Sequence, residues 1–197
     1  MKRCRKLSPN SLRIVVIDRL DEMNLHSYVR TIPHYPRHGI LFRDLTTLFL
    51  APEAFSHAIG NLRDFYRDLG IQAVAGIEAR GFILGAPLAV SLDVGFIAIR
   101  KSGKLPYDTV GRDYQLEYGT DRLEIHVDSV DVGQRILVVD DLLATGGTAH
   151  AAVQLLRDVG AVVDYAAFLV DLPELGGGDV LRAHDVVPHS LMSFPGH

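Results

Sequence analysis

The sequence contains one cysteine, no tryptophan and no long apolar run. The lone Cys4 cannot form an intramolecular disulfide, which fits a reducing, cytoplasmic environment. No stretch reaches the roughly 18 consecutive apolar residues of a transmembrane helix, so we expect no association with a membrane. Positive charge is not in excess either, because 20 Lys and Arg stand against 24 Asp and Glu. We therefore expect no nucleic-acid partner.

The rest of the composition is that of one folded domain. The 197 residues are 48% hydrophobic and 22% charged, which excludes intrinsic disorder and allows a sizeable core. The first 19 residues differ, because they carry six Lys and Arg against one acid, Asp18, and their apolar segment at residues 14–17 is too short for a signal peptide. We expect residues 1–24 to be a solvated basic extension, with an organellar address or a nucleic-acid arm as alternatives, and residues 25–197 to be a single domain.

Two hydrophobic periods alternate along the chain. Helical spacing covers residues 52–69, with Pro52 in the first turn and Gly70 as C-cap. A helix over residues 82–92 should be bent or start late because of Pro87, and another is expected over about residues 148–159. Apolar runs predict strands at residues 73–77, 96–99, 136–139, 166–170 and 186–191. Two alternating segments around a turn predict a hairpin within residues 114–126.

Short apolar strands that alternate with helices predict an α/β fold. The expected architecture is a doubly wound, mainly parallel sheet with helices on both faces. Ligands of such sheets bind beyond the carboxyl ends of the strands, so the residues at those ends are the candidates for function.

The most informative segment is residues 136–148, Ile-Leu-Val-Val-Asp-Asp-Leu-Leu-Ala-Thr-Gly-Gly-Thr. Asp140 and Asp141 end a buried strand and can accept hydrogen bonds from ribose hydroxyls. Small residues then lead into a helix N-terminus, which suits a phosphate: Ala144, Thr145, Gly146, Gly147 and Thr148. The segment therefore predicts a sugar-phosphate site, the alternative being a strand end and helix cap without a ligand. Its turn has neither a P-loop nor a dinucleotide-binding pattern.

Residues 136–148 resemble the diphosphoribosyl-binding signature of the type I phosphoribosyltransferases. Four further segments resemble the adenine phosphoribosyltransferases, at residues 30–44, 78–82, 99–106 and 116–120. The resemblance runs from about residue 25 to the Phe-Pro-Gly-His end and leaves out the basic extension. It departs from the family pattern at His34 and His38, where Asp and Pro are common.

The resemblance implies a pentosyltransferase of purine salvage. Such an enzyme transfers ribose 5-phosphate from 5-phosphoribosyl 1-diphosphate to N9 of adenine, giving AMP and diphosphate. The family fold adds a hairpin lid and a small N-terminal base-covering segment, and the family implies a homodimer and Mg²⁺. Substrate oxygens and water would hold the Mg²⁺, so we assign no side chain as a metal ligand, although Asp140 and Asp141 could contact it through water.

A leaving diphosphate needs cations around it. Arg100, Lys101 and Lys104 follow one predicted strand, and Arg80 follows another. The resemblance implies that these four residues bind the diphosphate, with Arg80 also catalytic, in a loop where a non-proline cis peptide often occurs. By family analogy, a neighbouring subunit could supply the basic cluster. The alternatives are a solvated basic loop and a surface arginine.

Glu117 is the candidate for the catalytic proton transfer, since adenine must lose its N9 proton as the new bond forms. The hairpin over about residues 105–122 would act as a lid that excludes water from the cationic sugar centre. An exposed strand carboxylate is the alternative for Glu117.

Leu41, Phe42 and Arg43 are the candidate adenine site. Leu41 and Phe42 could sandwich the flat purine, with Arg43 beside it, while ordinary core packing is the alternative. Two rival functions also remain: transfer to xanthine, hypoxanthine or orotate, and a non-enzymatic sensor of the sugar diphosphate. Residues 40–44 and 116–119 favour adenine, and about 24 N-terminal residues are too few for an added helix-turn-helix domain.

Overall fold

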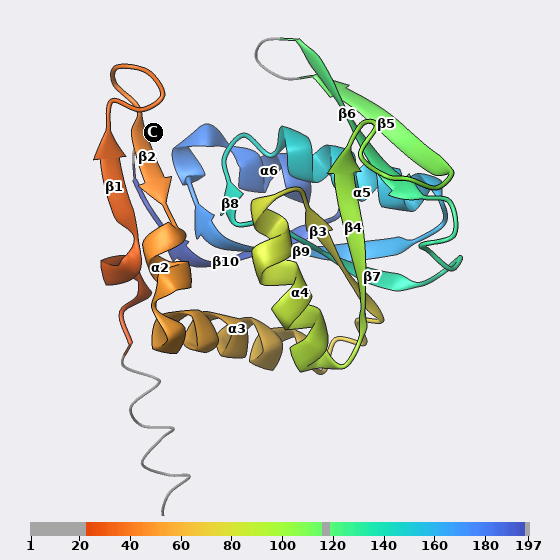
Figure 1. Cartoon of the computed structure of the whole chain (residues 1–197), viewed down its shortest axis with the longest axis horizontal. Coiled ribbons are helices and arrows are strands. Elements are labelled where there is room, and N and C mark those ends of the chain that lie inside the picture. The colour runs from red at the N-terminus through yellow and green to blue at the C-terminus, as the bar shows by residue number, and fades with distance from the viewer. Residues whose placement is uncertain (1–22, 116–118, 196–197) are drawn as a thin grey trace, which may run out of the picture.

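A mixed sheet forms the centre of the molecule (Figure 1). The computed structural model describes residues 23–115 and 119–195. The strands lie in the order β10-β9-β7-β3-β4-β6-β5, with the short β8 beside β9. In chain order these strands are β3 (Ala73–Ile77), β4 (Gly95–Lys101), β5 (Thr109–Gln115), β6 (Thr120–His126), β7 (Arg135–Val139), β8 (Leu142–Leu143), β9 (Val162–Asp171) and β10 (Val187–Ser193).

The strands from β10 to β4 run parallel, and β6 pairs antiparallel with both β4 and β5. This arrangement confirms the predicted α/β fold with a mainly parallel sheet. Each predicted strand is present, β3 with the predicted bounds and the others with shifted or longer ends. The first hairpin strand begins at Thr109, five residues before the predicted alternating segment and within the predicted lid, because Thr109 to Gln115 pair along β6 without interruption.

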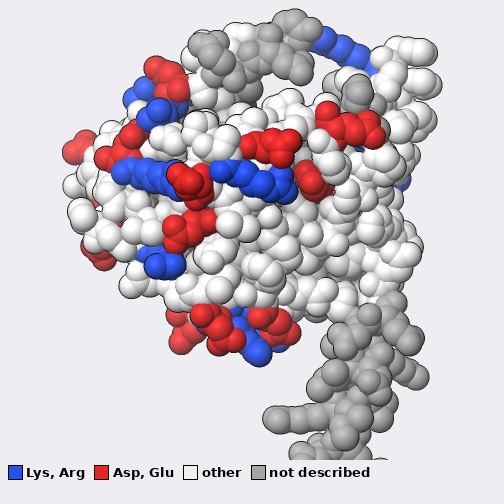
Figure 2. Space-filling view, turned by 180° about the vertical axis from the view of Figure 1, so that it is seen from behind, with Lys and Arg blue, Asp and Glu red and all other residues white. Residues whose placement is uncertain are grey.

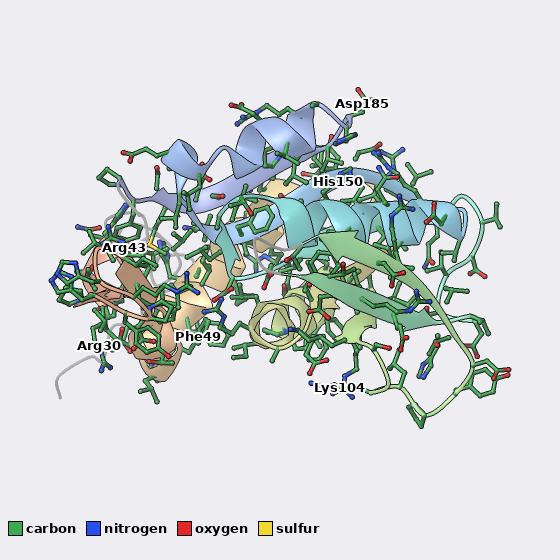
Figure 3. All side chains as sticks on the ribbon, turned by 90° about the horizontal axis from the view of Figure 1, so that it is seen from above. Arg30, Arg43, Phe49, Lys104, His150 and Asp185 are labelled. Atoms are coloured by element: carbon green, nitrogen blue, oxygen red, sulfur yellow. The ribbon has the colours of Figure 1, made fainter. Side chains whose placement is uncertain are left out.

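Helices cover both faces of the sheet, which Figure 3 shows from above. The buried side chains of α2 (Thr46–Leu50), α3 (Pro52–Tyr66) and α4 (Arg80–Leu92) belong to the core on one face. Those of α5 (Gly147–Asp158) and α6 (Gly177–Arg182) belong to the core on the other. Within these cores, α3 buries a stripe at helical spacing: Ala54, Ala58, Leu62 and Tyr66. The helix ends at Tyr66, three residues before the predicted end.

Pro87 lies inside α4. Its missing amide removes one helical hydrogen bond, but Leu84, Leu88 and Ala89 are buried in the core beside the sheet and hold the helix in place. The helix begins at Arg80, so the late start that the proline suggested is wrong.

A small hairpin stands apart from the main sheet. Strands β1 (Arg30–Pro33) and β2 (Leu41–Asp44) pair antiparallel as their own two-stranded sheet. We call residues 30–44 the hood. The 3-10 helix η1 (Leu25–Tyr28) precedes it, and η2 (Pro173–Leu175) lies before α6. Figure 1 shows the hood at one side of the molecule and the β5–β6 hairpin at the other.

The N-terminal extension and membrane association are the two remaining expectations about the chain as a whole. Residues 1–22 lie outside the described part, so the division into a basic extension and one domain stays a prediction. Among the described residues, no helix is long and apolar enough to cross a membrane.

Candidate functional site

Three adjacent strands carry the predicted site residues to one edge of the sheet. Asp140 and Asp141 follow β7, Arg80 follows β3, and Arg100 and Lys101 end β4. Because β3 pairs in parallel with both β7 and β4, their carboxyl ends lie side by side. Gly81 permits this approach, since a Cβ atom there would lie 2.6 Å from the carbonyl oxygen of Val139.

The predicted sugar-phosphate residues line a cavity of about 190 Å³. Its walls include six of the seven residues predicted for this role: Asp140, Ala144, Thr145, Gly146, Gly147 and Thr148. Arg80 also lines the cavity, while Asp141 does not and is only 1% exposed. We call residues 140–148 the sugar-phosphate loop.

The backbone of this loop is arranged for an anion. Gly146 has φ +81°, and a Cβ atom there would lie 2.9 Å from the carbonyl oxygen of Gly177, so α6 backs the loop closely. In the described part of the chain, no side chain caps the N-terminus of α5. Its first amides are therefore left for a ligand, and the helix dipole favours a phosphate there.

The two carboxyl groups influence each other's charge. Burial and the neighbouring Asp141 carboxylate raise the pKa of Asp140. Burial also raises the pKa of Asp141, and the charge of Arg80, whose Nε lies 3.0 Å from Asp141 Oδ2, acts against that rise. The backbone amide of Asp141 donates to Asp140 Oδ1 at 2.9 Å. The pair is thus poised to bind hydroxyl groups or a cation.

Glu78 organises the basic residues after β4. Its carboxylate accepts hydrogen bonds from Arg100 Nε at 3.2 Å, from the Lys101 backbone amide at 3.1 Å and from Lys104 Nζ. Burial alone would raise the pKa of Glu78, but the hydrogen bonds from Lys104, Lys101 and Arg100 outweigh it and hold the pKa at about 2. The structure also has a cis peptide between Glu78 and Ala79. Glu78 has no predicted role, although a lone acid at the end of a predicted strand is a signal that could have identified it.

A second network connects the β5–β6 hairpin to the site. Lys101 Nζ lies 2.9 Å from Asp121 Oδ2, and the Tyr114 hydroxyl donates to the same oxygen at 3.3 Å. The hydrogen bond with Asp121 raises the pKa of Lys101. Burial raises the pKa of Tyr114, and an interaction with the side chain of Thr148 in the sugar-phosphate loop acts against that rise. The four predicted diphosphate cations therefore face three carboxylates in this structure. Arg80 faces Asp141, Lys101 faces Asp121, and Arg100 and Lys104 share Glu78.

The hood carries the predicted adenine residues. Leu41 and Phe42 are half-buried on β2, and the ring of Tyr35 contacts that of Phe42 edge-on at 5.2 Å. The Arg43 guanidinium donates to Thr31 and to the Pro195 carbonyl group, so its side chain has protein partners. Figure 3 shows Arg43 and Lys104 in well-separated parts of the molecule.

The charge of Arg80 affects the pKa of Asp44, the last residue of the hood. Hydrogen bonds from Thr46 lower the pKa of Asp44, and the positive charge of Arg80 contributes to the same shift. Glu117, the predicted proton-transfer residue, lies outside the described residues, and its role stays a prediction.

Comparisons with known proteins agree with this geometry. The family model of the phosphoribosyl transferase domain matches residues 45–177. This span runs from the end of the hood to the start of α6 and contains the whole sugar-phosphate loop. The fold and the site thus define a phosphoribosyltransferase.

Comparison with individual relatives identifies the family within the phosphoribosyltransferases. An adenine phosphoribosyltransferase of Bradyrhizobium sp. (strain ORS 278) is 54% identical over 176 residues, covering 89% of this chain and 98% of the relative. A crystal structure of adenine phosphoribosyltransferase from Thermoanaerobacter pseudethanolicus is 43% identical, with a TM-score of 0.82 over 89% of this chain and 99% of that one. The chain belongs to the adenine phosphoribosyltransferase family, and the resemblance seen in the sequence is confirmed.

Several solved relatives contain ligands. The adenine phosphoribosyltransferase of Saccharomyces cerevisiae, complexed with D-2,5-dideoxy-2,5-imino-altritol 1,6-bisphosphate and adenine, is 33% identical, with a TM-score of 0.80. The match covers 89% of this chain and 99% of the yeast chain.

Proposed function

We propose that the protein transfers the 5-phosphoribosyl group of 5-phosphoribosyl 1-diphosphate to N9 of adenine, giving AMP and diphosphate. One observation carries the proposal: Asp140 and the uncapped N-terminus of α5 line a single cavity, and the buried Asp141 is the next residue after Asp140. A ligand that fits both parts has hydroxyl groups at one end and a phosphate at the other. The names of the relatives support adenine as the acceptor over xanthine, hypoxanthine or orotate.

The sugar-phosphate loop holds the ribose 5-phosphate in this account. Amides of residues 144–148 bind the phosphate, together with the hydroxyl groups of Thr145 and Thr148. Asp140 and Asp141 accept hydrogen bonds from the ribose hydroxyls. Because these contacts are made to parts of the substrate that do not react, they fix the position of the sugar carbon.

The cations bind the leaving diphosphate. Arg80 lines the same cavity as the sugar-phosphate loop, and Glu78 holds Arg100 and Lys104 at the neighbouring strand end. As the glycosidic bond lengthens, negative charge gathers on the diphosphate and positive charge on the sugar carbon. The negative charge is stabilised by the four cations Arg80, Arg100, Lys101 and Lys104. The aspartate pair lies on the side of the positive charge at the sugar carbon.

The base enters under the hood, against Leu41 and Phe42 and the backbone of Arg43. Phe42 offers a half-buried ring to a flat purine. Glu117 accepts the N9 proton, and the β5–β6 hairpin closes over the site and excludes water. These assignments rest on the resemblance.

Mg²⁺ fits the oxygen donors of this site. Burial is the main cause of the raised pKa values of Asp140 and Asp141, so a cation nearby would stabilise their charged forms. The described residues contain no group of three or more His, Cys, Asp or Glu that could bind a metal ion without the substrate. When bound, Mg²⁺ would neutralise charge on the diphosphate oxygens, with Asp140 and Asp141 contacting it through water.

We also propose a homodimer that acts in purine salvage in the cytoplasm. On α4, Ile83 and Val90 are 42% and 81% exposed and lie seven residues apart on one side of the helix. Phe96 at the start of β4 adds a partly exposed ring. A second copy would bury such an apolar surface. The small-molecule partners are adenine, 5-phosphoribosyl 1-diphosphate and AMP. On the face of the molecule in Figure 2, acidic and basic side chains are interspersed.

Product analysis tests this function. The protein is incubated with 5-phosphoribosyl 1-diphosphate, Mg²⁺ and one radiolabelled base at a time, and nucleotides are separated by chromatography. We expect AMP and diphosphate in equal amounts with adenine, and loss of turnover when a chelator removes Mg²⁺. Turnover with orotate or xanthine but not adenine would contradict the proposed acceptor, and no nucleotide from any base would favour a non-enzymatic sensor.

A further inference from the structure

The hood needs an attachment that fixes it over the site. Within the described residues, β1 and β2 pair only with each other, so no backbone ladder joins the hood to the main sheet. A two-stranded sheet of this size has little stability of its own. Side-chain contacts must therefore set the angle at which the hood stands.

Arg43 makes the contacts that could do this. It is 9% exposed, and its Nη1 donates to Thr31 Oγ1 at 2.6 Å, which joins the two hood strands. Its Nη2 donates to the carbonyl oxygen of Pro195 at 3.0 Å, and its Cζ lies 4.7 Å from the centre of the Phe194 ring. A buried guanidinium over an aromatic face is a favourable cation–π arrangement. The hood is thus joined to the segment that follows β10.

Phe194 continues the connection into the body of the protein. Its backbone amide donates to the carbonyl oxygen of Asp171, the last residue of β9, at 3.0 Å. Its ring also contacts that of His26 in η1, with centroids 5.0 Å apart. Phe194 therefore lies between the hood and the end of the main sheet.

The same strand end supports the sugar-phosphate loop. Leu143 of β8 pairs with Asp171, and the carbonyl oxygen of Leu143 accepts from the Leu172 amide at 3.0 Å. The carbonyl oxygen of Asp141 accepts from the amides of Leu169 and Val170 in β9. One strand end thus bears the sugar-phosphate loop on one side and Phe194, with the hood beyond it, on the other.

We infer that Arg43 and Phe194 are positioning residues that set the distance between the hood and the sugar-phosphate loop. The inference rests on the proposed function, in which the hood holds adenine and the loop holds the ribose. Transfer requires N9 to face the sugar carbon at bonding distance, so a displaced hood weakens adenine binding and slows transfer. The Arg43 side chain then acts on the base through Phe194 and Pro195 and does not contact it.

Variants of Phe194 test the inference, because Phe194 belongs to the C-terminal segment and not to the hood. Phe194→Leu keeps an apolar side chain but removes the aromatic face, and Phe194→Tyr keeps the face. We expect Phe194→Leu and Phe194→Ala to raise KM for adenine about five- to tenfold, with KM for 5-phosphoribosyl 1-diphosphate changed less than about twofold. Phe194→Tyr should restore the wild-type KM for adenine.

Controls separate this role from general damage. Phe65→Ala and Arg67→Ala remove a partly exposed ring and a surface guanidinium from the end of α3 and should leave both KM values unchanged. Melting temperatures of all variants are measured alongside. A KM for adenine that stays at the wild-type value in Phe194→Leu and Phe194→Ala, or a rise of both KM values together, would overturn the inference. If the wild-type protein itself did not use adenine, the proposed function would fail instead, whatever the variants did.

Discussion

Arg80 Nε lies 3.0 Å from Asp141 Oδ2, which joins the carboxyl ends of β3 and β7 by an ion pair. The two residues belong to different predicted subsites, Arg80 to the diphosphate and Asp141 to the ribose. Asp141 is buried while the Arg80 side chain is 52% exposed, so the arginine can turn toward an arriving diphosphate, and the buried Asp141 carboxylate then needs a ribose hydroxyl or a cation as its new partner. Substrate binding would then exchange one anionic partner of Arg80 for another.

The paired carboxylates give the first prediction. Asp140→Asn combined with Asp141→Asn removes the charge that, in the proposed function, faces the ribose and the developing positive charge. We expect kcat/KM for 5-phosphoribosyl 1-diphosphate to fall at least about a hundredfold. Stability should not fall, because burial disfavours both charges, as the raised pKa values of the pair show. Steady-state kinetics and thermal melting measure the two effects.

Asp185→Asn is the matched control, since Asp185 is exposed and lies in the turn after α6. It should behave as the wild type. Near wild-type kcat/KM in the double variant would show that the aspartates do not bind the ribose.

Lys104 gives the second prediction. Lys104→Ala removes one cation from the predicted diphosphate site and leaves the sugar-phosphate loop intact. The inhibition constant of diphosphate should rise about tenfold, and that of AMP less than about twofold. Product-inhibition kinetics decide between the outcomes: equal weakening of both inhibitors, or no weakening, would count against the role of Lys104.

Glu78 gives a prediction about pH. Its folded-state pKa of about 2 lies below the ordinary glutamate value, so its ion pairs stabilise the fold above pH about 4.3 and lose that effect as the pH falls toward 2. Glu78→Gln should lower the melting temperature by about 3–6 °C at pH 7 and reduce its further fall in acid.

Thermal melting from pH 7 to pH 2.5 measures both changes. Glu174→Gln, at an exposed position in η2, serves as the control and should follow the wild-type curve. Coinciding curves for the wild type and Glu78→Gln would show that the Glu78 ion pairs add no stability.

Local patterns in the sequence predicted the sheet and the sugar-phosphate loop. The five apolar residues of β3 and the run before Asp140 are buried strands because each is short, apolar and followed by turn or polar residues. Gly146 and Gly147 lie next to one another near the end of the sugar-phosphate loop. The close turn that they form at the start of α5 could therefore be predicted without knowledge of distant contacts.

Contacts between distant residues could not be predicted in this way. Glu78 meets Lys104, and Asp121 meets Lys101, only after β3, β4 and β6 have been assembled in the sheet. Arg43 was expected beside adenine because neighbouring residues pointed there. Its guanidinium contacts Pro195 and Phe194, about 150 positions along the chain, and no period or motif indicates such a pairing.

The most direct test of the account is the comparison of kcat/KM for adenine, hypoxanthine and guanine at saturating 5-phosphoribosyl 1-diphosphate. Adenine offers a donor at its exocyclic nitrogen and an acceptor at N1, and the other two bases present the reverse pattern. Backbone groups of Leu41 to Arg43 that match adenine would be left unpaired with the others, at about 1–3 kcal/mol for each buried group. We predict a preference for adenine of about a hundredfold or more. Comparable values for adenine and hypoxanthine would contradict the assignment of the base site.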